Sequence, residues 1–171
     1  MEVINPIYFL RPKIAVTGHR PNKLWGYDLH NPNYIEMRES FKRILVTKNA
    51  SEGITGMALG VDQIFALAVL ELKQQGYDIK LICTIPCLNH PCKWLEESRI
   101  LYYNILNKAD EVVQVSNKPY QPYLMQLRNE YNVDRCDELL AVYDGSKSGG
   151  TYNCIKYAES KRKPITFMRI P

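Results

Sequence analysis

The chain has 171 residues, a length that suits one domain with its own hydrophobic core. Hydrophobic residues make up 46% of it and charged residues 23%, which argues against disorder. The net charge of +4 is too small to indicate nucleic-acid binding by itself, and no apolar run approaches the roughly 18 residues of a membrane span. Residues 1–11 lack the pattern of a signal peptide, and the odd number of cysteines favours a reduced compartment, so we expect a cytoplasmic protein.

Short apolar runs alternate with amphipathic segments along the chain. The runs expected as strands cover residues 13–17, 53–55, 79–85, 111–115, 139–143 and 164–168. The segments expected as helices cover residues 34–45, 61–72, 94–105, 123–132 and 151–161. Strand–helix–strand alternation gives parallel strands joined by crossover helices. We therefore predict an α/β fold: a single Rossmann-like domain over residues 1–171, with a mainly parallel sheet and helices on both faces.

Three glycine-bearing turns follow expected strands, at residues 17–21, 55–62 and 144–151. Glycine lets backbone N–H groups approach a ligand without a Cβ in the way. A helix that begins directly after such a turn adds partial positive charge and unpaired N–H donors. Because the carboxyl ends of parallel strands meet at one edge of the sheet, the turns predict a pocket for a phosphorylated ligand.

Five motifs occur in order over residues 13–165. They are Thr17-Gly18-His19, Gly56-x-Ala58-x-Gly60-x-Asp62, Pro86 followed by Trp94, Arg128-Asn129-x-Tyr131-x-Val133-Asp134, and Gly149-Gly150-Thr151. This series resembles the YpsA-like branch of the SLOG superfamily, which joins the Lonely Guy phosphoribohydrolases with the DprA-type DNA-processing proteins. The resemblance implies a Rossmann-like sheet and a nucleotide or nucleotide-derived ligand.

The turns and the resemblance together give a set of candidate ligand-binding residues. Gly149, Gly150 and Thr151 are expected to hold a phosphate. Arg128 would supply a fixed positive charge, and Asp62 would hydrogen-bond a hydroxyl group. The full set is Gly18, His19, Arg20, Gly56, Gly60, Asp62, Arg128, Gly149, Gly150 and Thr151.

Each candidate also has a purely structural interpretation. The glycines of the first two turns could serve close packing, and the Gly-Gly-Thr loop could simply cap a helix. Arg128 could pair with Asp134 instead of a ligand. His19 and Arg20 are as readily ordinary turn residues as ligand contacts. In the loop that follows them, Trp25 and Tyr27 either pin the chain or stack on a base. The sequence leaves these alternatives open.

The resemblance leaves the catalytic residues unknown. In the Lonely Guy enzymes a glutamate lies three residues after the loop threonine, and that place holds Cys154 here. A neutral thiol cannot stabilise an oxocarbenium-like centre as a carboxylate does. Substitute carboxylates would be Glu130, Asp134, Asp144 or Asp62.

We therefore expect nucleotide binding, in a signalling or sensor module for example, ahead of N-glycoside cleavage of nucleoside monophosphates. A DprA-like single-stranded-DNA-binding module is the third hypothesis. It would need a basic surface with exposed aromatic side chains. Nucleic acid ranks below a nucleotide-type small molecule as a partner, no membrane contact is expected, and a homodimer is left open.

A cluster of potential metal ligands lies at Cys83, Cys87, His90 and Cys92. Cys83 falls inside an apolar strand, where cysteine acts as a small hydrophobic residue. The spacing also lacks the CxxC-like pair of compact zinc sites. We expect no bound metal and no cofactor.

Overall fold

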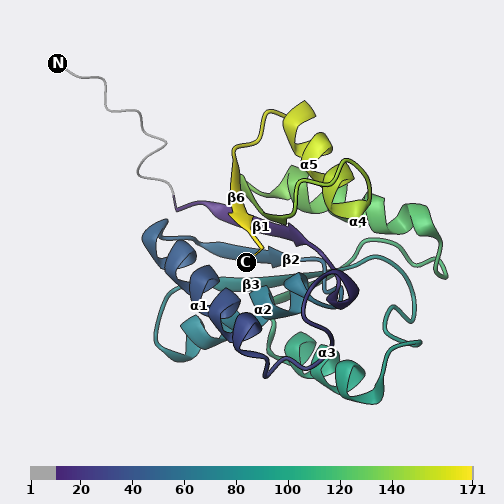
Figure 1. Ribbon diagram of the computed structural model, residues 1–171, viewed down its shortest axis with the longest axis horizontal. Coiled ribbons are helices and arrows are strands. Elements are labelled where there is room, and N and C mark those ends of the chain that lie inside the picture. The colour runs from purple at the N-terminus through teal and green to yellow at the C-terminus, as the bar shows by residue number, and fades with distance from the viewer. Residues whose placement is uncertain (1–10, 171) are drawn as a thin grey trace.

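The computed structural model describes residues 11–170, which form one α/β domain around a parallel six-stranded sheet (Figure 1). The strands are β1 (Lys13–Gly18), β2 (Glu52–Thr55), β3 (Lys80–Ile85), β4 (Glu111–Gln114), β5 (Glu138–Tyr143) and β6 (Ile165–Arg169). The helices are α1 (Pro32–Thr47), α2 (Val61–Gln74), α3 (Glu96–Lys108), α4 (Pro122–Arg135) and α5 (Gly150–Ser160), with a short 3-10 helix at Pro21–Lys23. The predicted fold class is confirmed.

The order of the strands creates a crevice at one edge of the sheet. The order is β4-β3-β2-β1-β5-β6, so the chain builds outward from β1 in one direction and then returns to β1's other side with β5. Gly18 at the end of β1 is in register with Val142 near the end of β5. In open parallel sheets ligands bind where the strand order reverses, outside the carboxyl ends of the strands. That point lies here between β1 and β5.

The helices cover both faces of the sheet (Figure 1), and the alternation of side chains along each strand supplies both cores. Ile14 and Val16 of β1 join the core beneath α1, α2 and α3, whereas Ala15 between them joins the core beneath α4 and α5. This alternation follows from the two-residue period of a strand. The central strands β1, β3 and β5 are therefore mostly apolar along their length, because both of their faces are buried.

One helix begins later than predicted. The sequence places the third helix at residues 94–105, but α3 begins at Glu96. Trp94 lies in the preceding turn, where its backbone N–H donates to the carbonyl of Pro91 at 3.0 Å. Leu95 has an extended ψ of 149°, so the helical conformation cannot start before Glu96. Across residues 11–170 the helices are too short or too polar for any of them to span a bilayer.

Candidate functional site

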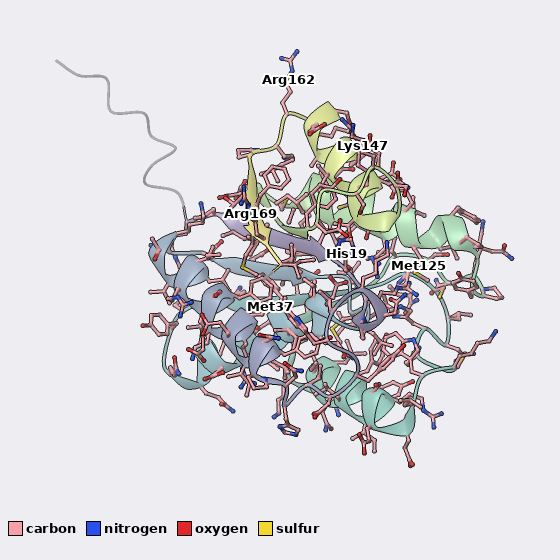
Figure 2. The ribbon with its side chains drawn as sticks, in the orientation of Figure 1. His19, Met37, Met125, Lys147, Arg162 and Arg169 are labelled. Carbon is pink, nitrogen blue, oxygen red and sulfur yellow. The ribbon has the colours of Figure 1, made fainter. Side chains whose placement is uncertain are left out.

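A cavity of about 250 Å³ lies at the point where the strand order reverses. We call it the switch-point cavity. It is formed by the loop after β1, the start of α2, one face of α4 and the start of α5. Its lining residues are Thr17, Gly18, His19, Arg20, Asn22, Lys23, Ala58, Asp62, Met125, Arg128, Asn129, Gly150 and Thr151. Figure 2 labels two of them, His19 from the loop after β1 and Met125 from α4.

The start of α5 is open toward this cavity. Gly149 precedes the helix with a φ of 96°, a conformation that side chains rarely adopt, and no side chain caps the helix. A Cβ at Gly149 or Gly150 would meet no atom within 4 Å. The first turn of α5 carries no acidic residue. Its N–H donors and partial positive charge are therefore available to an anion.

Arg128 is buried in α4, with 4% of its surface exposed, and lines the cavity. Its Nη1 donates a hydrogen bond to the carbonyl of Gly56, and its Nε donates to Asn129 Oδ1 at 3.0 Å. The alternative pairing with Asp134 is wrong, because that carboxylate accepts from the Tyr157 hydroxyl at 2.9 Å instead. The guanidinium is thus fixed in place, and a guanidinium remains charged even when buried.

Asp62 provides a carboxylate at the start of α2, where it too lines the cavity. Its Oδ2 accepts from the backbone N–H of Ala58 at 3.1 Å. Burial raises the pKa of Asp62, while the nearby charge of Arg128 and the Ala58 hydrogen bond act against this rise. Among the residues 11–170 that line the cavity, Asp62 is the only carboxylate. Glu130 and Asp134, two of the proposed substitutes, line a separate surface hollow with Tyr157.

His19 contributes a buried ring nitrogen to the same cavity. Its Nε2 lies 3.2 Å from Asp144 Oδ1. The hydroxyl and the backbone N–H of Ser146, with a smaller contribution from His19, lower the pKa of Asp144 to about 2. Asp144 therefore holds the turn after β5 through Ser146 and also lies beside the buried ring of His19.

Three of the candidate glycines permit close packing between elements. A Cβ at Gly18 would lie 2.6 Å from Val61, and one at Gly56 would lie 2.6 Å from the guanidinium of Arg128. At Gly60, which has a φ of 90°, a Cβ would lie 2.6 Å from the carbonyl oxygen of His19. Gly18 also lines the cavity, whereas Gly56, Gly60 and Gly149 lie outside its lining and position the residues that form it.

Sequence reasoning missed several lining residues. Met125 and Asn129 lie three residues before and one residue after Arg128 on α4, so the helical period around Arg128 could have indicated at least Met125. Asn22 and Lys23 reach the cavity because the chain turns back in the 3-10 helix after β1. No pattern in the sequence signals that turn.

The two loop aromatics have different roles. Trp25 packs edge-on against Tyr34, with ring centroids 5.0 Å apart, and the Tyr34 hydroxyl donates to the carbonyl of Gly26 at 2.6 Å. Trp25 therefore pins the loop. Tyr27 remains 54% exposed.

The cysteines are packed as hydrophobic residues. Cys83 lies in the core, and burial raises the pKa of its thiol to about 12. Burial likewise raises the pKa of Cys154 to about 12, so this thiol stays neutral in the position of the Lonely Guy glutamate. Within residues 11–170 no three His, Cys, Asp or Glu side chains are grouped to hold a metal ion. The absence of metal remains a prediction for the protein in solution.

Fold and cavity together define a Rossmann-like α/β protein whose crevice lies beside a glycine-opened helix. Comparison with protein families makes this assignment specific. The model described as the YspA SLOG family matches residues 14–170, and the chain belongs to this family. The resemblance inferred from the motifs is confirmed.

Two relatives agree with this assignment. The chain is 36% identical over 146 residues to the SPbeta prophage-derived protein YoqJ of Bacillus subtilis, covering 77% of this chain and 85% of that protein. It is 31% identical over 153 residues to a UPF0398 protein of Bacillus cereus, covering 86% and 83%.

Two structures of DNA processing protein A share the fold. The protein from Streptococcus pneumoniae superposes with a TM-score of 0.61 at 14% identity, covering 95% of this chain and 52% of that one. This chain thus spans about half of the pneumococcal protein. The protein from Helicobacter pylori, whose structure is described for its single-stranded DNA binding mode, superposes with a TM-score of 0.63 at 19% identity, covering 95% and 67%.

Proposed function

We propose that this protein binds a nucleotide or nucleotide-derived small molecule, with a phosphate group at the start of α5. The observation that carries the proposal is the open helix start facing a buried cation. Gly150 and Thr151 line the cavity together with Arg128, and space for a ligand remains above both glycines of the turn. Uncapped N–H groups and a fixed guanidinium are the donors that proteins use for phosphate.

The remaining lining residues fit the rest of such a ligand. His19 lines the same cavity, and its Nε2 lies 3.2 Å from the carboxylate of Asp144. Asp62 accepts one hydrogen bond at Oδ2, which leaves its other oxygen for a ribose hydroxyl. Arg20 and Lys23 add positive charge to the cavity wall.

Binding without efficient cleavage is the expected activity. The thiol of Cys154 is neutral and buried, so it cannot replace the glutamate of the Lonely Guy enzymes. Asp62 is held by Ala58 and is the only carboxylate found in the lining within residues 11–170. Incubation with nucleoside monophosphates should release no free base on chromatography. Turnover on the order of one per second or faster would identify an enzyme and point to Asp62 as the acid.

Calorimetry with AMP on matched charge-deletion variants tests the site. Arg128→Ala should weaken binding about ten- to a hundredfold, because a charge-assisted hydrogen bond to phosphate is worth roughly 1.5–3 kcal/mol. Arg162→Ala is the control, since it removes the same charge from the turn beyond the far end of α5 (Figure 2). Equal affinities for the two variants would refute a phosphate site at Arg128.

Single-stranded DNA is the second candidate ligand. The fold likeness to the Helicobacter pylori protein favours it, as do Arg20 and Lys23 beside the cavity. A DNA ligand that contacts several phosphates would bind with an affinity that falls steeply with salt. Tight binding of an oligonucleotide with such a slope, and no binding of AMP, would favour DNA over the small molecule.

A further inference from the structure

A second hollow adjoins the switch-point cavity. It has a volume of about 580 Å³ and is lined by Tyr27, Leu59 and Trp94 together with the positively charged Lys93. Arg20 and Asn22 line both spaces and so form a wall common to them. We call this second space the aromatic hollow.

Trp94 is held rigidly at the edge of the aromatic hollow. Its ring packs edge-on against His90, with centroids 5.0 Å apart, and against the buried Tyr102 at 5.4 Å. Its backbone N–H is bonded to Pro91. Burial lowers the pKa of His90 to about 3, so the imidazole beside Trp94 is neutral at ordinary pH. The indole is therefore held between two neighbouring aromatic rings, neither of which is charged at ordinary pH.

The size of the switch-point cavity requires a nucleotide to extend beyond it. At about 250 Å³ it is smaller than the roughly 300–1,000 Å³ of typical small-molecule sites. The aromatic hollow offers the missing space directly across the shared wall. Its walls have what a nucleobase needs: flat aromatic rings for stacking and an aliphatic side chain, Leu59, from the glycine turn after β2.

We infer that the aromatic hollow binds the base of a nucleotide whose phosphate lies at the start of α5. This inference rests on the proposed function and makes the ligand class narrower. Arg20 and Asn22, in the wall between the two spaces, would lie beside the ribose and the phosphate of that nucleotide. A sugar phosphate that lacks a base would then occupy the switch-point cavity alone and bind more weakly.

Two measurements on the full chain test the inference. The first compares AMP with ribose 5-phosphate by calorimetry, on wild-type protein and on Trp94→Leu. AMP should bind wild-type protein more tightly than ribose 5-phosphate does. Trp94→Leu should weaken the binding of AMP roughly five- to a hundredfold while leaving the affinity for ribose 5-phosphate unchanged.

The second measurement uses fluorescence, because Trp25 and Trp94 are the only tryptophans in the sequence. AMP should quench the emission of Trp25→Phe, in which Trp94 remains, and leave that of Trp94→Phe unchanged.

The outcomes separate the inference from the proposed function. Equal binding of AMP and ribose 5-phosphate, with no change in Trp94 emission, would overturn the base site and leave the phosphate site standing. Failure of both ligands to bind would overturn both. The Trp25→Phe variant keeps Trp94 intact, so its fluorescence decides the matter even where Trp94→Leu unfolds.

Discussion

Two helices begin at the same edge of the sheet after glycine turns, yet their starts are built in opposite ways. At α2, the backbone of Gly60 lies against His19, Val61 N–H donates to the His19 carbonyl at 3.3 Å, and Asp62 supplies an acid of its own. No side chain caps either helix, but at α5 space remains above Gly149 and Gly150 and the first turn carries no acidic residue.

The difference shows how one kind of turn serves two purposes. The glycine before α2 allows the loop after β1 to pack against the start of the helix, and the helix's partial positive charge is compensated by groups of the chain itself. The glycines before α5 leave the partial positive charge of that helix uncompensated, which favours the binding of an external anion. A glycine turn in the sequence therefore predicts that another group comes close to the backbone. Only the structure shows whether that group is part of the protein or whether space is left for a ligand.

The largest effect that this comparison predicts is on stability. Gly60→Ala should lower the free energy of unfolding by about 3 kcal/mol, because the residue has a φ of 90° and its new Cβ would meet the His19 carbonyl at 2.6 Å. For a chain of this size the melting temperature should fall by roughly 6–12 °C, as measured by calorimetry.

Gly150→Ala is the matched control at the open helix start. Its φ is ordinary and its Cβ would meet nothing, so unfolding should change by less than about 1 kcal/mol. The same Cβ would enter the switch-point cavity and weaken AMP binding about tenfold. Equal destabilisation by the two alanines would contradict the comparison.

A smaller effect is expected from Asp62→Asn. The asparagine can still accept from Ala58, so the protein should fold. If Asp62 accepts from a ribose hydroxyl, AMP should bind about three- to tenfold more weakly, the equivalent of one hydrogen bond. Inorganic phosphate should bind no more weakly than to wild-type protein, because a negative charge has left the cavity. A loss of phosphate binding would instead place the anion beside α2.

The two acids at this edge should respond to pH in opposite directions. Asp144, whose pKa is lowered to about 2, stabilises the fold fully above its ordinary value of 3.8, and this stabilisation is lost as the pH falls toward 2. Asp62 has a raised pKa, so the fold favours its protonated form, and its contribution to stability is lost as the pH rises through that pKa. Carboxyl carbon NMR titration should show Asp62 protonating first on acidification; the reverse order would count against this account.

The smallest effect should come from removing metal. The thiol of Cys83 is buried in the core and stays protonated, so chelator should leave the melting temperature unchanged and elemental analysis should find no stoichiometric zinc. About one zinc per chain, lost on Cys87→Ser, would overturn this prediction.

The fold could be predicted from the sequence because its signals are local. The central strands are buried on both faces, so runs such as residues 139–143 are continuously apolar, and helical periods separate the strands. The predicted start of α3 was too early because Trp94 is a large apolar residue at a helical spacing. Its ring packs against His90 and Tyr102 in the turn before the helix, and periodicity alone cannot distinguish such a residue from one on a helix face.

The site was only partly predictable. Of the residues that the turns and the family motif indicated, Gly18, His19, Arg20, Asp62, Arg128, Gly150 and Thr151 line one cavity in the structure, and their binding of a ligand stays a prediction. The sequence could not reveal that Arg128 occupies the space beside Gly56 and that the backbone of His19 occupies the space beside Gly60, since those contacts join segments far apart in the chain. The position of Trp94 in the adjoining hollow is likewise a product of tertiary packing.

The most direct test follows backbone amides by NMR during titration with inorganic phosphate. If the open start of α5 is the anion site, the amide signals of Gly150 and Thr151 should shift in a saturable manner. Those of Val61 and Asp62, at the closed start of α2, should stay in place. Shifts confined to the start of α2, or no saturable shift at either helix, would contradict the account.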